Sequence, residues 1–177
     1  MLRSELPTSE YNPFYHTYIL ALGDVGLIQE LKRGREEFLS LLEDIPESKL
    51  EYAYADGKWT LAELLLHIMD AERVFQYRAL CFARNDKTPL PGFDQDEYVP
   101  NSNALARTKD DLIQEYKAIR ESTLCLFNSF NEDALKQIGV ASNSRMSVRA
   151  LGFIISGHQA HHVKIIRERY LQHSFLV

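Results

Sequence analysis

The chain has 177 residues, of which 45% are hydrophobic and 25% are charged, with a formal net charge of −5. This length and composition suit a single globular domain, which we expect over residues 1–177. The acidic balance and the lack of a basic stripe argue against nucleic acid as a partner. The chain has no run of about 20 apolar residues that could cross a bilayer and no apolar signal segment at its start. We therefore expect no membrane partner and a cytoplasmic location.

The two cysteines, Cys81 and Cys125, are far apart in the sequence. Each falls inside an apolar helical pattern, which favours a buried free thiol over a disulfide scaffold. Neither belongs to a CxxC metal motif. We therefore expect no catalytic cysteine from the chain itself.

Four long segments repeat apolar residues at helical spacing, and no segment shows a sustained strand-like alternation. They cover about residues 24–46, 60–84, 108–130 and 147–171. The second has the clearest start, because Thr60 and Glu63 form a T-x-x-E capping box that Trp59 and Leu64 flank as a hydrophobic staple. The sequence therefore predicts an all-α four-helix bundle.

The connection between the second and third helices, from Asn85 to Arg107, is too long for a simple turn and contains three prolines. Such a segment could cross the whole bundle, so that the two helices run parallel, or it could fold over one end. The pattern leaves both open. We expect residues 87–99 to cover the functional end of the bundle, with Phe93 and Tyr98 as anchors.

Three of the six histidines crowd into the last helix as GHQAHH, and a fourth lies in LLLHIMD on the second helix. At about 100° per residue, His158 and His162 lie about 30° and 10° from the centre of the apolar face of the last helix. His161 lies about 90° away, at its edge. One turn separates His158 from His162, so their imidazoles can meet. The same reasoning turns His67 toward the core.

Burying three imidazoles is unfavourable unless each ring nitrogen finds a partner, and one shared cation serves all three. The spacing therefore predicts a metal site made by His67, His158 and His162. Three histidine ligands leave coordination positions open, which is typical of catalytic or sensing sites. Asp70, one turn after His67, is either a partner that orients a ligand or an ordinary helical carboxylate.

The chain resembles the DinB-like (YfiT-like) metal-binding four-helix proteins over nearly its whole length. The stretches that carry the resemblance are GKWTLAELLLHIMDAERVFQYRALCFARND, KTPLPGFDQDEYV and SVRALGFIISGHQAHHVKIIRERYL. The resemblance implies the same three histidine ligands for one divalent ion, and histidine suits Zn, Ni or Fe. It also implies a homodimer. For characterised members it implies transfer of a low-molecular-weight thiol such as bacillithiol, and for others a metal-dependent hydrolase.

Three functions follow from these observations. The first is an enzyme in which the metal activates an external small-molecule thiol that attacks an electrophile. The second is a hydrolase that uses metal-activated water, with Asp94, Asp96, Glu97 or His161 as a candidate base. The third is a non-catalytic metal-binding or sensing module. We expect Trp59, Phe93 and Asp94 near the pocket, and Arg78 or Arg169 could hold a substrate anion.

Overall fold

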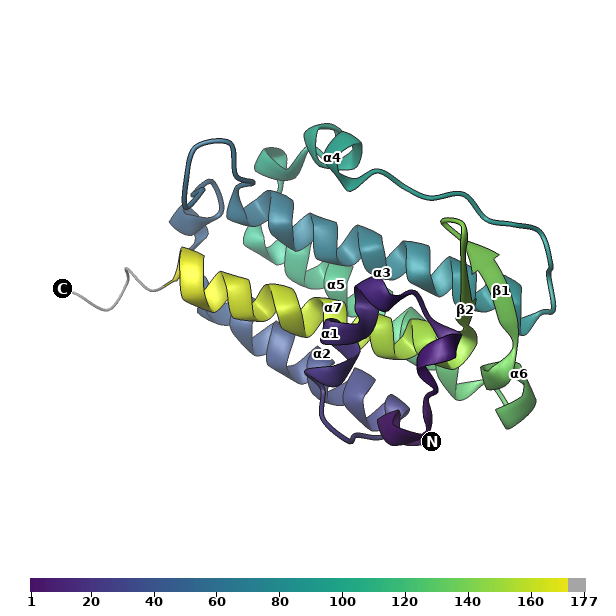
Figure 1. Cartoon of the computed structure of the whole chain (residues 1–177). Helices are drawn as coiled ribbons and strands as arrows, with labels where there is room; N and C mark the ends of the chain where they lie inside the picture. The colour runs from purple at the N-terminus through teal and green to yellow at the C-terminus, as the bar shows by residue number, and fades with distance from the viewer. Residues whose placement is uncertain (172–177) are drawn as a thin grey trace.

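The computed structural model describes residues 1–171 and is mostly helical (Figure 1). Four long helices form the bundle that the sequence predicts. They are α2 (Leu27–Asp44), α3 (Leu61–Ala83), α5 (Lys109–Asn128) and α7 (Val148–Ile165), the last continued by a π-helical turn over Ile166–Tyr170. Helix α3 packs against α5 and α7, and α2 packs against the same two helices.

The helix starts follow the capping residues that the sequence displays. The Thr60 hydroxyl accepts a hydrogen bond from the Glu63 backbone, and the Glu63 carboxylate accepts one from the Thr60 backbone. Thr108 opens α5 with the same two-way arrangement. The first long helix begins later than expected, at Leu27, because the Asp24 carboxylate accepts a hydrogen bond from the Ser4 backbone 20 residues away.

The connection between α3 and α5 crosses the length of the bundle, so these two helices run in the same direction (Figure 1). It contains one short helix, α4 (Gln95–Tyr98), and two 3-10 turns, Val99–Asn101 and Ala104–Ala106. The crossover interpretation of this segment is therefore confirmed.

Several short elements were not predicted. The short helices are α1 (His16–Leu20) and α6 (Glu132–Lys136), and an antiparallel hairpin joins β1 (Ile138–Ala141) to β2 (Ser144–Ser147). Each strand has only four residues, too few to reveal an alternating pattern. Ser142 and Asn143 turn the hairpin with positive φ angles of 51° and 58°, as a two-residue type I′ turn requires.

A buried polar network joins all four long helices at the centre of the bundle. The fully buried Arg120 guanidinium of α5 donates to both oxygens of Glu72 on α3, at 2.7 and 2.8 Å. It also donates to Gln159 of α7 and to the backbone oxygen of Leu31 on α2. The Gln159 amide in turn donates to the Gly34 carbonyl at 2.7 Å. Because Gln159 follows His158, this network fixes the helix that carries two of the histidines.

Helix α1 lies directly against α7, where a glycine allows a close approach. A Cβ on Gly157 would lie 2.5 Å from the backbone oxygen of Tyr18. Only a residue without a side chain permits this contact, which brings the Tyr18 ring next to the histidine pair of α7. Among the described residues, no helix combines the length and apolar character needed to span a membrane.

Candidate metal centre

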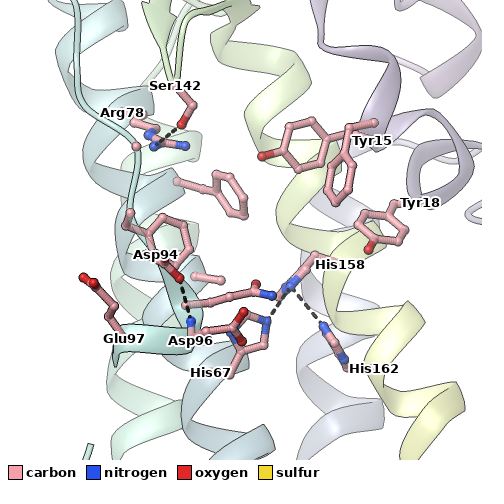
Figure 2. Close-up of a pocket in the computed structure, with 16 residues that line it drawn as sticks. Tyr15, Tyr18, His67, Arg78, Asp94, Asp96, Glu97, Ser142, His158 and His162 are labelled. Carbon is pink, nitrogen blue, oxygen red and sulfur yellow. Dashed lines mark hydrogen bonds between the residues drawn. The ribbon is translucent and has the colours of Figure 1, made fainter. Parts of the chain in front are cut away.

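Two long helices bring the three predicted histidines together (Figure 2). His67 comes from the second turn of α3, while His158 and His162 occupy successive turns of α7. The Nε2 atom of His158 lies 3.1 Å from Nε2 of His67 and 3.1 Å from Nε2 of His162. One ligand atom from each residue lies within 4.8 Å of the other two.

This arrangement fits a shared cation better than a set of hydrogen bonds. The Nε2 atom of His158 carries either one hydrogen or one lone pair, so it satisfies only one of the two nitrogens that face it. Three lone pairs directed at one ion satisfy all three rings. Nitrogens that bind one ion at about 2.0–2.1 Å lie about 2.9–3.4 Å apart, and the observed 3.1 Å lies in this range. The donor set therefore suits a divalent ion with affinity for imidazole.

Burial keeps all three imidazoles neutral, which is the form that binds a metal. Burial lowers the pKa of His67 to about 4, although the nearby Asp96 carboxylate opposes the shift. Burial, together with His67 and His161, lowers the pKa of His162 to about 3. The pKa of His158 falls well below its usual value, mainly through burial and also through the neighbouring histidines. At neutral pH each ring therefore offers a lone pair.

The histidines face a cavity of about 820 Å³, a volume typical of metabolite-sized ligands. Helices α3 and α7 form its floor, and α1, the hairpin turn and the long connection surround it (Figure 2). The connection contributes residues 92–97. The expectation that residues 87–99 fold over the histidines is therefore confirmed for residues 92–97, whereas Tyr98, the second expected anchor, is exposed and borders a different cavity.

The three acidic side chains of the connection have different positions. Asp94 caps α4 by accepting a hydrogen bond from the Asp96 backbone at 2.9 Å. Glu97 also borders a separate cavity beside Asp70. Asp96 borders both the main cavity and a smaller one next to His162, and its charge acts on His67. Of the candidate bases in this segment, Asp96 is the best placed.

Asp70 and Trp59 differ in their relation to the histidines. Asp70 lies outside the main cavity and pairs with Arg73 at 3.3 Å, and within residues 1–171 it makes no hydrogen bond to a histidine. The structure therefore supports its reading as an ordinary helical carboxylate. The Trp59 ring lies 5.0 Å from the His67 ring, centroid to centroid, and borders the smaller cavity of about 280 Å³.

His161 is not part of the three-histidine cluster. It is only partly buried, and its ring packs on Tyr18 with 4.7 Å between centroids. Tyr18 and Tyr15 line the main cavity from the N-terminal segment, together with Ser142 of the hairpin turn. The sequence analysis missed these three residues. The aromatic run NPFYHTY was the one available signal, since such a cluster in a polar segment needs a surface to cover.

The remaining candidate residues differ in their burial and in whether they line the main cavity. Arg78 is buried and lines the main cavity, whereas Arg169 is exposed. Phe93 also lines the cavity, and its ring packs against Tyr98 at 5.5 Å between centroids. Both cysteines are free, as expected, but neither is fully buried: Cys81 is partly buried, and Cys125 is exposed on α5.

Comparisons with known proteins agree with this geometry. A protein of Oceanobacillus iheyensis with the provisional name metal-dependent hydrolase is 28% identical over 125 residues, 68% of this chain and 70% of the relative. YfiT of Bacillus subtilis, described as a probable metal-dependent hydrolase with an unusual four-helix bundle topology, superposes with a TM-score of 0.69 at 16% identity. That match covers 80% of this chain and 82% of YfiT.

The mycothiol-dependent maleylpyruvate isomerase superposes with a TM-score of 0.68 at 11% identity, over 93% of this chain and 62% of the isomerase. These solved structures therefore share the fold. The family model described as the DinB superfamily matches residues 30–166, which include all three histidines. The resemblance seen in the sequence is confirmed, and the chain belongs to the DinB superfamily.

Proposed function

We propose that this chain is a metal-dependent hydrolase whose ion is held by His67, His158 and His162. One observation carries the proposal: three neutral imidazoles converge within 4.8 Å at the wall of an open cavity of about 820 Å³. A purely structural site usually closes its coordination with a fourth protein ligand. The provisional names of the O. iheyensis relative and of YfiT support the same class of reaction.

Each side chain has a distinct part in this reaction. A divalent ion held by the three imidazoles would supply a Lewis acid and lower the pKa of a bound water. The Asp96 carboxylate, whose charge acts on His67, would accept the proton of the attacking water. Phe93 and Tyr18 line the cavity with aromatic surface that excludes bulk water around the reacting groups.

A second candidate is transfer of a low-molecular-weight thiol to an electrophile. Two observations favour it: neither Cys81 nor Cys125 lines the cavity, and the cavity has room for a second small molecule beside the substrate. The attacking sulfur would therefore come from outside the chain, for example from bacillithiol. The likeness in fold to a mycothiol-dependent isomerase supports this candidate less strongly, because it rests on 11% identity.

The test begins with metal content. Protein loaded separately with Zn, Ni and Fe is analysed for bound metal as wild type, His162→Ala and His161→Ala. We expect about one ion in wild type and His161→Ala, and a strong loss in His162→Ala. Equal loss in both variants would contradict the ligand assignment.

Each loaded form is then assayed on a panel of aryl esters and amides, and separately with bacillithiol and an aryl electrophile. For a hydrolase, Asp96→Asn lowers the turnover of the best substrate by about 10²–10⁴-fold, while Asp94→Asn, its neighbour on the same segment, changes it little. Turnover only in the presence of thiol supports the second candidate. Stoichiometric metal without turnover in either panel indicates a sensing or storage role.

A further inference from the structure

Arg78 is a buried cation without a carboxylate partner. Arg78 is only 2% exposed, and within residues 1–171 no aspartate or glutamate pairs with it. Its Nη2 atom donates to two neutral acceptors, the Pro91 carbonyl at 3.0 Å and the Ser142 hydroxyl at 2.9 Å. A guanidinium has five N–H donors, so these contacts use only part of its capacity. A buried charge without a counterion is unfavourable unless another group supplies one.

The surroundings hold the Arg78 guanidinium in one place. The Phe75 and Phe93 rings lie 5.8 and 6.0 Å from its central carbon, measured to the ring centroids. The Tyr15 hydroxyl faces it from the 3-10 turn that precedes α1 (Pro13–Tyr15) and acts on its charge. Ser142, its partner in the hairpin turn, adopts the left-handed backbone conformation that a type I′ turn requires. Arg78 is thus held by three separate parts of the chain.

Arg78 and the metal centre line the same cavity (Figure 2). Arg78 follows His67 by eleven residues on α3, which is three helical turns and about 16 Å of rise, so both point to the same side of the helix. Ala71 and Phe75 lie between them on the cavity wall. At the histidine end, the exposed Asp96 carboxylate of the connection places a negative charge that acts on His67. The cavity therefore has a cation-binding end and a positively charged end.

We propose that Arg78 binds an anionic group of the ligand, a carboxylate, sulfonate or phosphate, while the opposite end of that ligand reaches the three histidines. Only the part of this inference that concerns the histidine end rests on the proposed metal-dependent function. The substrate class is then an elongated small molecule with an anionic terminus separated from its reacting group. The Tyr15 and Ser142 hydroxyls offer further hydrogen bonds to that terminus.

A series of two-ended ligands tests the proposal by binding. The probes are ω-mercaptocarboxylates from 3-mercaptopropionate to 11-mercaptoundecanoate, each compared with the ω-mercaptoalcohol of equal length. The protein is loaded with Co²⁺, and the thiolate-to-cobalt absorption band reports each dissociation constant. At the chain length that spans the cavity, we expect the carboxylate to bind about tenfold tighter than the alcohol, as a charged hydrogen bond predicts. The shortest pair should show no such preference.

Four variants isolate the contribution of Arg78. The preference should fall below about twofold in Arg78→Met and Arg78→Gln, and Arg78→Lys should keep part of it. Arg73→Met is the matched control, because Arg73 lies on the same helix but pairs with Asp70 and Glu115 outside the cavity. It should retain the full preference. An undiminished preference in the neutral Arg78 variants, or equal binding of acid and alcohol at every length, overturns the proposal.

A second titration separates this inference from the metal function. If cobalt does not bind, the metal-dependent function fails, and the metal-free protein is titrated with octanoate and octanol. The fluorescence of Trp59, the single tryptophan, reports this binding because its ring lies 5.0 Å from the His67 ring. A preference for octanoate that requires Arg78 upholds the anion site. Equal binding, or none, overturns it.

Discussion

Replacing Glu72 with alanine tests how much the buried network at the bundle centre contributes to stability. Glu72 and Arg120 are 2% and 0% exposed, and two charge-assisted hydrogen bonds join them. Removing the carboxylate leaves the Arg120 charge buried and uncompensated, and it also removes the nearer of two acceptors of the Thr123 hydroxyl. Breaking a buried ion pair in this way costs about 3–5 kcal/mol. For a domain of this size, that loss lowers the melting temperature by about 6–20 °C.

Urea denaturation followed by circular dichroism measures the change, with chelator present so that metal binding does not add to the stability. The matched control is Glu37→Ala, which breaks an exposed pair with Arg33 and should cost less than about 1 kcal/mol. Combining Glu72→Leu with Arg120→Met replaces the whole pair with apolar surface and should recover most of the loss. A loss of unfolding free energy below about 1 kcal/mol in Glu72→Ala, or a double variant less stable than Glu72→Ala, would refute the reasoning.

Four further predictions concern the site and the stability of the bundle. Gly157→Ala should destabilise the protein by about 1–3 kcal/mol despite the higher helix propensity of alanine, because its Cβ meets the Tyr18 carbonyl. Ser156→Ala, which removes a buried hydroxyl without a partner in the described residues, should be neutral or stabilising in the same denaturation assay. Chelation should lower the melting temperature but leave the helical dichroism intact, since the bundle core is large enough to fold without an ion. Loss of the helical signal would instead make the ion structural. Burial raises the pKa of Glu10, but its hydrogen bonds to Arg149 and Ser147 lower it by more, so the net pKa falls below the ordinary value of 4.5. The stability that Glu10 contributes is therefore complete above pH 4.5 and is lost as the pH falls through the lower folded value. The difference between wild type and Glu10→Gln in urea titrations should shrink over that range, and a constant difference would contradict it.

The long helices and the three histidines could be predicted because local signals determine them. Thr60 and Thr108 each show a capping residue followed by a carboxylate three positions on, and both open helices within one residue of the predicted start. The helical wheel separates His162 from His161 because one residue changes the direction by about 100°. In the structure His162 joins the cluster, while His161 packs on Tyr18.

The rest of the cavity depends on contacts between distant parts of the chain, which no local pattern encodes. Ser142 meets Arg78 across 64 residues, and Tyr18 reaches α7 only because Gly157 leaves room for its backbone. For Asp70, by contrast, the local spacing allowed two interpretations. Its spacing from His67 allows contact with the ligands, but Arg73 lies equally close in sequence and takes the carboxylate.

The long connection shows why two interpretations of one segment need not exclude each other. Its length and prolines fit a crossover that spans the bundle and also fit a cover for the histidines. Because α3 and α5 run in the same direction, the chain has to return along the bundle, and it does so along the outside of α3, the helix that carries His67 and Arg78. On this route the crossover passes the cavity, and residues 92–97 line it.

The buried network and the histidine cluster share one turn of α7, so the network also positions a predicted metal ligand. Gln159 is held by Arg120 and by the Gly34 carbonyl, so the adjacent His158 has a fixed position on the bundle before any ion arrives. His67 is fixed in the same way, since α3 carries Glu72 little more than one turn later. Because burial already keeps the imidazoles neutral, no proton has to leave them at neutral pH. The ligand set is therefore preorganised by the protein core, so that the ion contributes less to folding and its open positions stay available to a ligand.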